Sequence, residues 1–154
     1  MAAISTFAAG SMVIDNTSTS PTPSSYTPST ALAANSTFYW RVRVYNVLGQ
    51  YSNWSSVRHF HTKLPPPWLV SPGNGEVTTT LPAFGWSNVS GATSYVLQVS
   101  TSPSFSTLKI NKTVIGSSYT ATSTLSAGKK YYWRVYAKGT FKSQWSLRRY
   151  FITQ

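Results

Sequence analysis

The chain repeats itself at an interval of about 90 residues, which is the usual size of one β-sandwich domain. Residues 24–46 (SSYTPSTALAANSTFYWRVRVYN) match residues 117–139 (SSYTATSTLSAGKKYYWRVYAKG). Residues 52–62 match residues 143–153, after a loop that is two residues shorter in the second copy. The match is long and includes rare aromatic residues, so it predicts two related domains rather than a chance likeness.

The composition indicates that these domains are built of strands. Aromatic residues make up 15% of the chain and charged residues only 10%. Val, Tyr, Trp and Phe suit pleated, half-buried surfaces, whereas helix-forming Glu and Met are scarce. Short apolar runs separated by Gly, Pro and Ser turns predict seven strands in the second copy, within 65–72, 82–87, 95–100, 108–114, 118–125, 131–138 and 147–153. We therefore expect an all-β, immunoglobulin-like sandwich of two sheets.

The second copy resembles fibronectin type III domains, most closely the tandem domains of bacterial surface and secreted proteins. The positions that carry the resemblance are Trp86, Tyr95, Leu97, Val99, Leu125, Gly128, Tyr131, Trp133, Arg134, Val135, Ala137, Trp145, Ser146 and Phe151. The resemblance covers residues 65–153 fully and about 24–62 closely. It implies that Tyr131 is the tyrosine-corner residue, whose hydroxyl bonds to nearby backbone. The first copy has Phe38 at that place and should lack this bond.

The first copy is expected to be incomplete, because it lacks counterparts of the first two strands of the second copy. We predict an incomplete repeat over residues 1–63, which includes the Ser/Thr/Pro-rich segment 17–30, and a complete domain over 64–154. Half a sandwich exposes an apolar face and an unpaired strand edge. Either the chain is a piece of a longer repeat array, or another copy supplies the missing strands by strand addition.

Both copies contain the sequence S-x-W-S, which resembles the latter part of the W-S-x-W-S motif of cytokine-receptor domains. In that motif the tryptophan stacks between arginines of a neighbouring strand. The residues that would form such a cation–π ladder here are Arg41, Arg43 and Trp54 in the first copy and Arg134 and Trp145 in the second. We interpret the ladder as structural, with a gain of roughly 0.5–1 kcal/mol for each exposed pair. The alternative is an aromatic binding face.

Alternation along the strand of the first copy assigns its residues to two faces. Trp40, Val42 and Val44 should face the core, whereas the arginines between them face outward. Because this places part of the aromatic set in the core, we do not expect nucleic acid as the partner.

The charge is strongly unbalanced, with 13 basic residues against two acidic ones and a net charge of +11. Such a surface attracts polyanions of several kinds. The candidate polyanion face lies in the second copy, and an anionic polysaccharide is its candidate ligand. Its residues are Lys109, Lys112, Lys129, Lys130, Lys138 and Lys142.

Several function classes find no support in the sequence. There is no cysteine, and the one aspartate, Asp15, is far from the one glutamate, Glu76. Paired-carboxylate or Ser-His-Asp chemistry therefore has no candidate residues. His59 and His61 point the same way from one strand, but nothing completes a metal site with them. We expect no enzyme activity, no cofactor, no metal and no membrane span.

Five of the seven asparagines lie in N-x-S/T sequons and are candidate glycosylation sites: Asn16, Asn35, Asn53, Asn88 and Asn111. This excess favours a location outside the cell or at its surface. The function expected first is a structural or adhesive module that self-assembles into oligomers or fibres by strand complementation, with other copies or neighbouring repeats as partners. The alternatives are a module that binds polyanions or glycans, and an accessory domain of a larger secreted enzyme.

Overall fold

A computed structural model describes residues 25–46 and 48–154, which fold into two compact units. Among these residues, unit 1 comprises 25–33 and 37–61, and unit 2 comprises 34–36 and 62–154. Unit 2 thus begins two residues before the boundary predicted at 64. It also takes in the turn Ala34–Ser36, which sequence comparison assigned to the first repeat.

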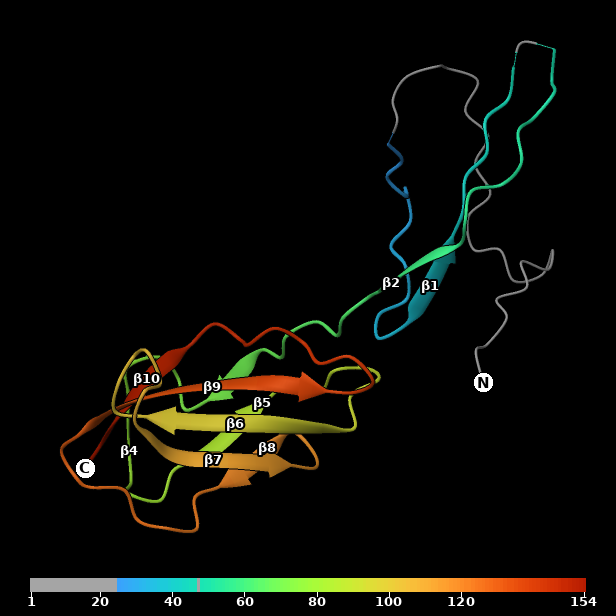
Figure 1. The fold of residues 1–154 in the computed structure, drawn as a ribbon. Coiled ribbons are helices and arrows are strands. Elements are labelled where there is room, and N and C mark those ends of the chain that lie inside the picture. The colour runs from blue at the N-terminus through green and yellow to red at the C-terminus, as the bar shows by residue number, and fades with distance from the viewer. Residues whose placement is uncertain (1–24, 47) are drawn as a thin grey trace. The chain divides into compact units, whose positions relative to one another are not determined.

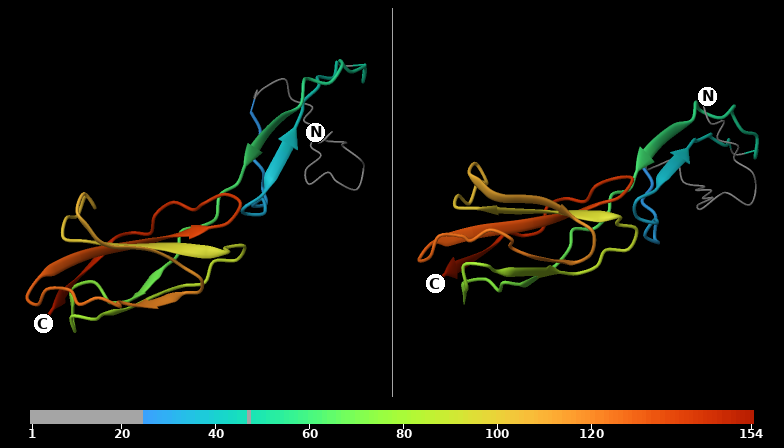
Figure 2. Two further views of the ribbon diagram at one scale, coloured as in Figure 1. Left: turned by 60° about the horizontal axis from the view of Figure 1, so that its bottom comes forward. Right: turned by 90° about the horizontal axis from the view of Figure 1, so that it is seen from below.

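Unit 2 is a sandwich of a three-stranded and a five-stranded sheet, seen as two layers in Figures 1 and 2. The smaller sheet consists, in spatial order, of β3 (Leu69–Ser71), β5 (Ala83–Trp86) and β8 (Ser118–Thr120). The larger sheet consists, in spatial order, of β4 (Glu76–Thr78), β10 (Arg149–Thr153), β9 (Lys130–Lys138), β6 (Ser94–Ser100) and β7 (Leu108–Val114). This strand order confirms the predicted all-β sandwich of the fibronectin type III kind.

Strand β4 is the element of unit 2 that sequence analysis missed. It pairs in parallel with β10, whereas the other strand pairs of unit 2 are antiparallel. The preceding turn is tied to β10, because Gly75 N–H donates to the Tyr150 carbonyl (2.7 Å) and Asn74 Oδ1 accepts from Tyr150 N–H (3.2 Å). Gly75 has φ +84°, which suits glycine. The three residues of β4, which follow this turn, have no alternating pattern that would predict a strand.

The core of unit 2 lies between the sheets and follows the alternation of β6 and β9. Leu97 and Val99 on β6 are fully buried, as are Trp133 and Val135 on β9. Phe84 of the smaller sheet packs edge-on against Trp133, with ring centroids 5.2 Å apart. Period-two burial of this kind is what the sequence pattern predicts for strands with one face in a core.

Tyr131 ties the start of β9 to the preceding loop. Its ring is buried and stacks on Phe151 with centroids 5.6 Å apart, while its hydroxyl accepts a hydrogen bond from Ser126 N–H (3.1 Å). This is the kind of bond that defines a tyrosine corner. In unit 1 the corresponding pair is Phe38 with Phe60, stacked at 5.7 Å. Phenylalanine has no hydroxyl, so Phe38 keeps the stacking without the hydrogen bond.

The described part of unit 1 contains one antiparallel strand pair, β1 (Thr37–Trp40) and β2 (Arg58–His61). Beyond β1 the chain continues as a long hairpin that turns around Asn46. The Asn46 side-chain oxygen accepts from the N–H groups of Leu48 (3.0 Å) and Gln50 (2.9 Å). An asparagine that bonds to backbone two residues ahead is a common device for closing a turn.

Candidate binding surfaces

The two serines of S-x-W-S attach an irregular segment to strand β9 in unit 2. Ser143 N–H donates to the Ala137 carbonyl, and Ser143 Oγ accepts from Ala137 N–H, both at 2.9 Å. Ser146 makes the same two bonds to Val135, at 2.8 Å from its N–H and 3.1 Å to its hydroxyl. Each serine therefore satisfies both backbone groups of one β9 residue and turns the intervening tryptophan toward the outer face of the sheet.

Unit 1 repeats this arrangement residue for residue. Ser52 N–H donates to the Val44 carbonyl (3.0 Å), and Ser52 Oγ accepts from Val44 N–H (3.2 Å). Ser55 makes the same pair of bonds to Val42, at 2.8 and 3.0 Å. The partners lie at the same offsets as the sequence match, so these two bonding patterns are equivalent.

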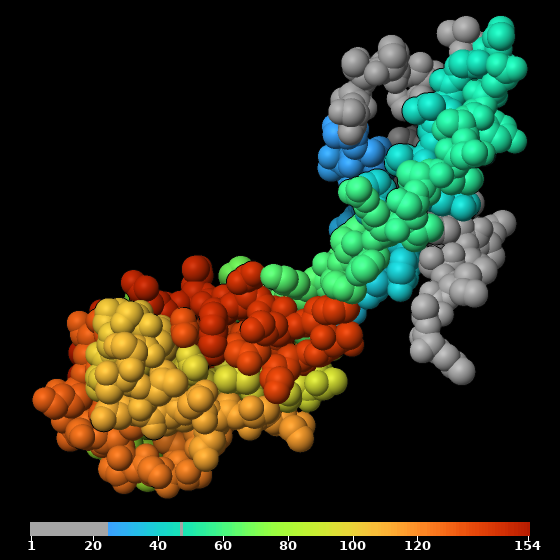
Figure 3. All heavy atoms as spheres, viewed as in Figure 1, coloured from blue at the N-terminus to red at the C-terminus, as the bar shows by residue number. Residues whose placement is uncertain are grey.

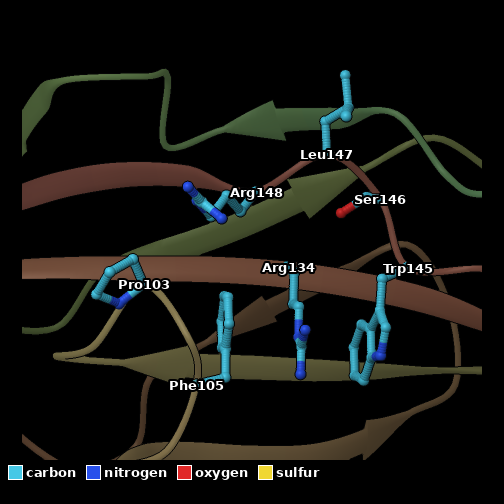
Figure 4. A pocket seen from close by; sticks show the side chains of 7 residues that line it. All are labelled: Pro103, Phe105, Arg134, Trp145, Ser146, Leu147 and Arg148. Carbon is cyan, nitrogen blue, oxygen red and sulfur yellow. The ribbon is translucent and has the colours of Figure 1, made fainter.

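Arg134 is the centre of the ladder in unit 2. Its guanidinium carbon lies 3.9 Å from the Phe105 ring centroid and 4.0 Å from that of Trp145, so the group is stacked between two aromatic rings. Figure 4 shows the three side chains standing side by side. Gln98 Oε1 accepts from Arg134 Nε (3.1 Å) and Nη2 (2.9 Å). Packing and hydrogen bonds therefore fix the orientation of the guanidinium.

Phe105 is a ladder residue that sequence analysis missed. It lies in the loop between β6 and β7 and has φ +61°, which is uncommon for a residue with a side chain. Serines hold this loop in place: Ser100 Oγ donates to the Thr107 carbonyl (2.8 Å), and Ser102 N–H donates to Ser100 Oγ (3.0 Å). The signal in the sequence is a single aromatic residue in a loop otherwise rich in Ser, Thr and Pro.

In unit 1 the ladder contains two arginines around one tryptophan. The guanidinium carbons of Arg41 and Arg43 lie 4.2 and 4.3 Å from the Trp54 ring centroid. Arg43 also lies 4.2 Å from the Tyr51 ring centroid. The structure thus brings together the arginines and the tryptophan that the motif selected in this copy.

At one position of the ladder, the residue that carries the cation and the residue that carries the ring are exchanged between the two units. Arg43 and Tyr51 of unit 1 correspond in sequence to Tyr136 and Lys142 of unit 2. The cation and the ring have changed places, and Lys142 Nζ lies 5.9 Å from the Tyr136 ring centroid. Tyr136 also packs edge-on against Trp145, with centroids 4.5 Å apart. A cation beside an aromatic ring is thus kept at this position in both units, which supports a structural role for the ladder.

A shallow hollow of about 540 Å³ lies on the outer surface of unit 2 beside this ladder. It is lined by Phe105, Arg134 and Trp145, together with Arg148 from the segment before β10. Burial lowers the pKa of Arg134 from its ordinary value, but an arginine keeps its charge in a protein. The hollow is therefore lined by one half-buried cation with a fixed orientation and by one exposed cation.

The predicted polyanion lysines do not all share one face. Lys130 and Lys138 alternate with the buried residues of β9 and so point outward. Lys109 lies on β7 at a shift of register and has no partner residue on β6. Lys112 is the register partner of the buried Leu97, so it lies on the inner side of the edge strand β7. The prediction that groups Lys112 with the others is therefore wrong, because β7 pairs with β6 in a register that the sequence alone did not supply.

The remaining two lysines of that group lie outside the strands. Lys129 is in the turn that leads into β9, where its N–H donates to Thr153 Oγ1 (3.3 Å). Lys142 lies in the loop after β9 and reaches the outer face at Tyr136. Figure 3 shows this outer face of β6, β7 and β9 from outside, with the loop around 101–107 standing on it in yellow.

Unit 1 exposes an apolar face opposite to its ladder. This face, the apolar face of unit 1, consists of Trp40 (41% exposed), Val42 (57%), Val44 (71%) and Phe60 (41%). The equivalent residues of unit 2, each 0% exposed, are Trp133, Val135, Ala137 and Phe151. The expectation that Trp40, Val42 and Val44 face a core is thus wrong for the described structure, because no second sheet lies over them within the described residues.

Arg58 lies at the edge of the apolar face, with its guanidinium carbon 6.0 Å from the Trp40 ring centroid. Its counterpart in unit 2 is Arg149, which stands opposite Trp133 on β10. Arg149 Nη1 donates to the Val70 carbonyl of β3 (3.1 Å) and so links the two sheets of unit 2. Unit 2 therefore shows how an arginine at this position can bind the backbone of an opposing sheet.

The candidate sequons differ in their surroundings. Asn53, Asn88 and Asn111 are exposed, and Asn16 lies outside the described residues. Asn35 has φ +56°, and its side-chain oxygen accepts from Phe141 N–H (2.7 Å) within unit 2. Because that amide already has a structural partner, Asn35 is the poorest acceptor among the four described sequons.

His59 and His61 have ring centroids 5.3 Å apart, and among residues 25–46 and 48–154 no group of three or more His, Cys, Asp or Glu could hold a metal ion. No helix in these ranges is long and apolar enough to cross a membrane.

No protein-family model and no curated protein matches the chain. Similar solved structures include a Fn3-like protein from Clostridium thermocellum, with 22% identity and a TM-score of 0.45 over 57% of this chain and 91% of that one. Another is the FN1–FN3 domains of chicken CNTN1, with 14% identity and a TM-score of 0.48 over 80% of this chain. The match covers 45% of the chicken chain, less than half of its length. The assignment of unit 2 to the fibronectin type III-like fold rests on its own strand order and register.

Proposed function

We propose that the chain is a non-catalytic structural module of the extracellular kind, and that unit 1 binds a second copy of the chain through its apolar face. The observation that carries this proposal is the contrast between the exposed Trp40, Val42 and Val44 and their fully buried equivalents in unit 2. Large apolar side chains gathered on one exposed face commonly mark an interaction site.

The partner that fits this face best is the same face of another copy. Two apolar sheet faces can pack about 10 Å apart as the layers of a sandwich. Packing the β1–β2 sheets of two copies face to face gives each sheet the cover that β9 and β10 have in unit 2. A contact in which both partners use the same patch closes as a symmetric dimer and leaves no further face of that kind open.

The distribution of charge permits this approach. Unit 1 carries three arginines and Asp15, a net charge of +2, whereas unit 2 carries ten basic residues and Glu76, a net charge of +9. Arg41 and Arg43 lie on the ladder side, away from the apolar face. Arg58 is the one arginine of unit 1 at the edge of the face, so most of the repulsion expected of a chain with charge +11 arises outside the contact.

The test is light scattering of the purified chain over a dilution series from roughly 100 to 1 μM. The face is smaller than the roughly 20–30 residues a side of a stable complex, so we expect a dimer that dissociates on the order of micromolar concentration. A mass that falls from dimer toward monomer on dilution supports the proposal. A monomer mass at every concentration contradicts it, and would leave strands from elsewhere in a longer chain as the cover.

A further inference from the structure

The hollow beside Arg134 has no part in the proposed self-association, which uses the apolar face of unit 1. We propose that this hollow, with the adjoining cations of β9, binds the sulfate or carboxylate groups of an acidic polysaccharide. The two cations of the hollow are the half-buried Arg134 and the exposed Arg148.

The orientation of the Arg134 guanidinium is fixed before an anion binds. Phe105 and Trp145 hold its guanidinium from both sides, and Gln98 accepts from two of its three nitrogens. The third nitrogen, Nη1, makes no hydrogen bond among the described residues. A guanidinium whose orientation is fixed before binding loses little side-chain entropy when a ligand arrives.

No acidic side chain of unit 2 competes for these cations. Glu76 is the only acidic residue of the unit, and its carboxylate accepts from Gly73 N–H in the turn before β4. The hollow lies on the outer face of the larger sheet, where Arg134 is bonded to Gln98 instead of a carboxylate. An arriving anion therefore meets cations without an internal counter-charge.

The hollow is continued by a row of cations along β9. Lys130, Arg134 and Lys138 point to the same outer face at intervals of four residues, which is about 13 Å at the rise of a strand. Tyr132 and Tyr136 lie between them on that face. Such a row suits an extended chain with anionic groups at intervals better than a single small anion.

The aromatic residues of this face favour a polysaccharide over single-stranded nucleic acid. Nucleic-acid binding of that kind depends on free ring faces on which bases stack. The facing sides of Phe105 and Trp145 are filled by Arg134, and Tyr136 packs edge-on against Trp145. A ligand of the hollow would therefore be bound through charge and not through stacking.

The experiment measures binding to dextran sulfate at several salt concentrations for Arg148→Ser, for a control variant of the same net charge, and for a combined variant that loses one further charge. Arg148→Ser removes the exposed cation of the hollow, and we expect about fivefold weaker binding with a shallower salt dependence. The combined variant Arg148→Ser/Lys138→Ser should bind more than about tenfold more weakly. Lys112→Ser is the matched control, because it removes one charge from the inner side of β7 and should change the affinity less than about twofold.

Two outcomes would overturn the proposal. Equal losses for Arg148→Ser and Lys112→Ser would show that the total charge binds the polyanion and that the hollow has no special part. An oligothymidylate that binds the unsubstituted chain as tightly as dextran sulfate at the same salt concentration would show that the surface does not prefer a polysaccharide. Weaker oligothymidylate binding, by about tenfold or more, is the expected result.

Discussion

Replacing Trp133 by alanine is expected to lower the free energy of unfolding of unit 2 by about 3–5 kcal/mol. Trp133 is 0% exposed and packs on Phe84 across the sandwich. Its indole N–H makes no hydrogen bond among the described residues, so the loss is one of packing alone. Urea unfolding followed by circular dichroism measures the change.

The matched control is Trp40→Ala, which changes the equivalent residue of unit 1. Trp40 is 41% exposed, so at a concentration where the chain is monomeric we expect a loss below about 1 kcal/mol. Comparable losses for the two variants would show that a second layer covers Trp40 as it covers Trp133. That result would remove the basis for treating the face of unit 1 as open.

The second large effect is expected from Val42→Ser/Val44→Ser. Burial of a valine side chain contributes about 1.5–3 kcal/mol, and a symmetric contact loses each valine twice, so the dimer should weaken by about 100-fold or more. The S-x-W-S bonds to Val42 and Val44 use only the backbone atoms of the valines, and the ladder lies on the other side of the hairpin. The monomer should therefore keep its fold, which near-ultraviolet circular dichroism of the aromatic residues would show.

Val70→Ser/Val77→Ser provides the control for this double substitution. Both valines lie in unit 2 and are exposed, at 63% and 52%, so the same chemistry is changed at another place. We expect light scattering to show that this control dimerises as the unsubstituted chain does. Equal weakening by both double variants would indicate nonspecific apolar contact rather than a contact through unit 1.

The strands of unit 2 could be predicted where burial alternates along the sequence. The range 131–138 was expected as a strand, and β9 is Lys130–Lys138; the range 108–114 coincides with β7. Strand β4 escaped prediction because its three residues are fixed by pairing with β10, and not by an apolar pattern of their own. Local pattern therefore identified β9 and the edge strand β7, and missed the short strand β4, which has no apolar pattern of its own.

The candidate surfaces could be predicted only in part. The S-x-W-S motif selected Trp54 and Trp145 because a motif is local. Phe105 instead reaches Arg134 from a loop that is held by the hydrogen bonds of Ser100 to Thr107 and Ser102, and in which Phe105 has a positive φ. Lys112 was assigned to the wrong face because the side of an edge strand follows from its register. The exposure of Val44 was missed because alternation tells which residues share a face and not whether another sheet covers it.

The central claim, that the apolar face of unit 1 binds the same face of another copy, is tested most directly by cysteine cross-linking. The chain has no cysteine, so a single Val42→Cys substitution gives one thiol at the middle of the face. At concentrations where light scattering detects dimer, mild oxidation should convert most of this variant into a disulfide-linked dimer. The exposed control, Val70→Cys, should stay largely monomeric under the same conditions. Equal and slow cross-linking of the two variants would contradict the claim.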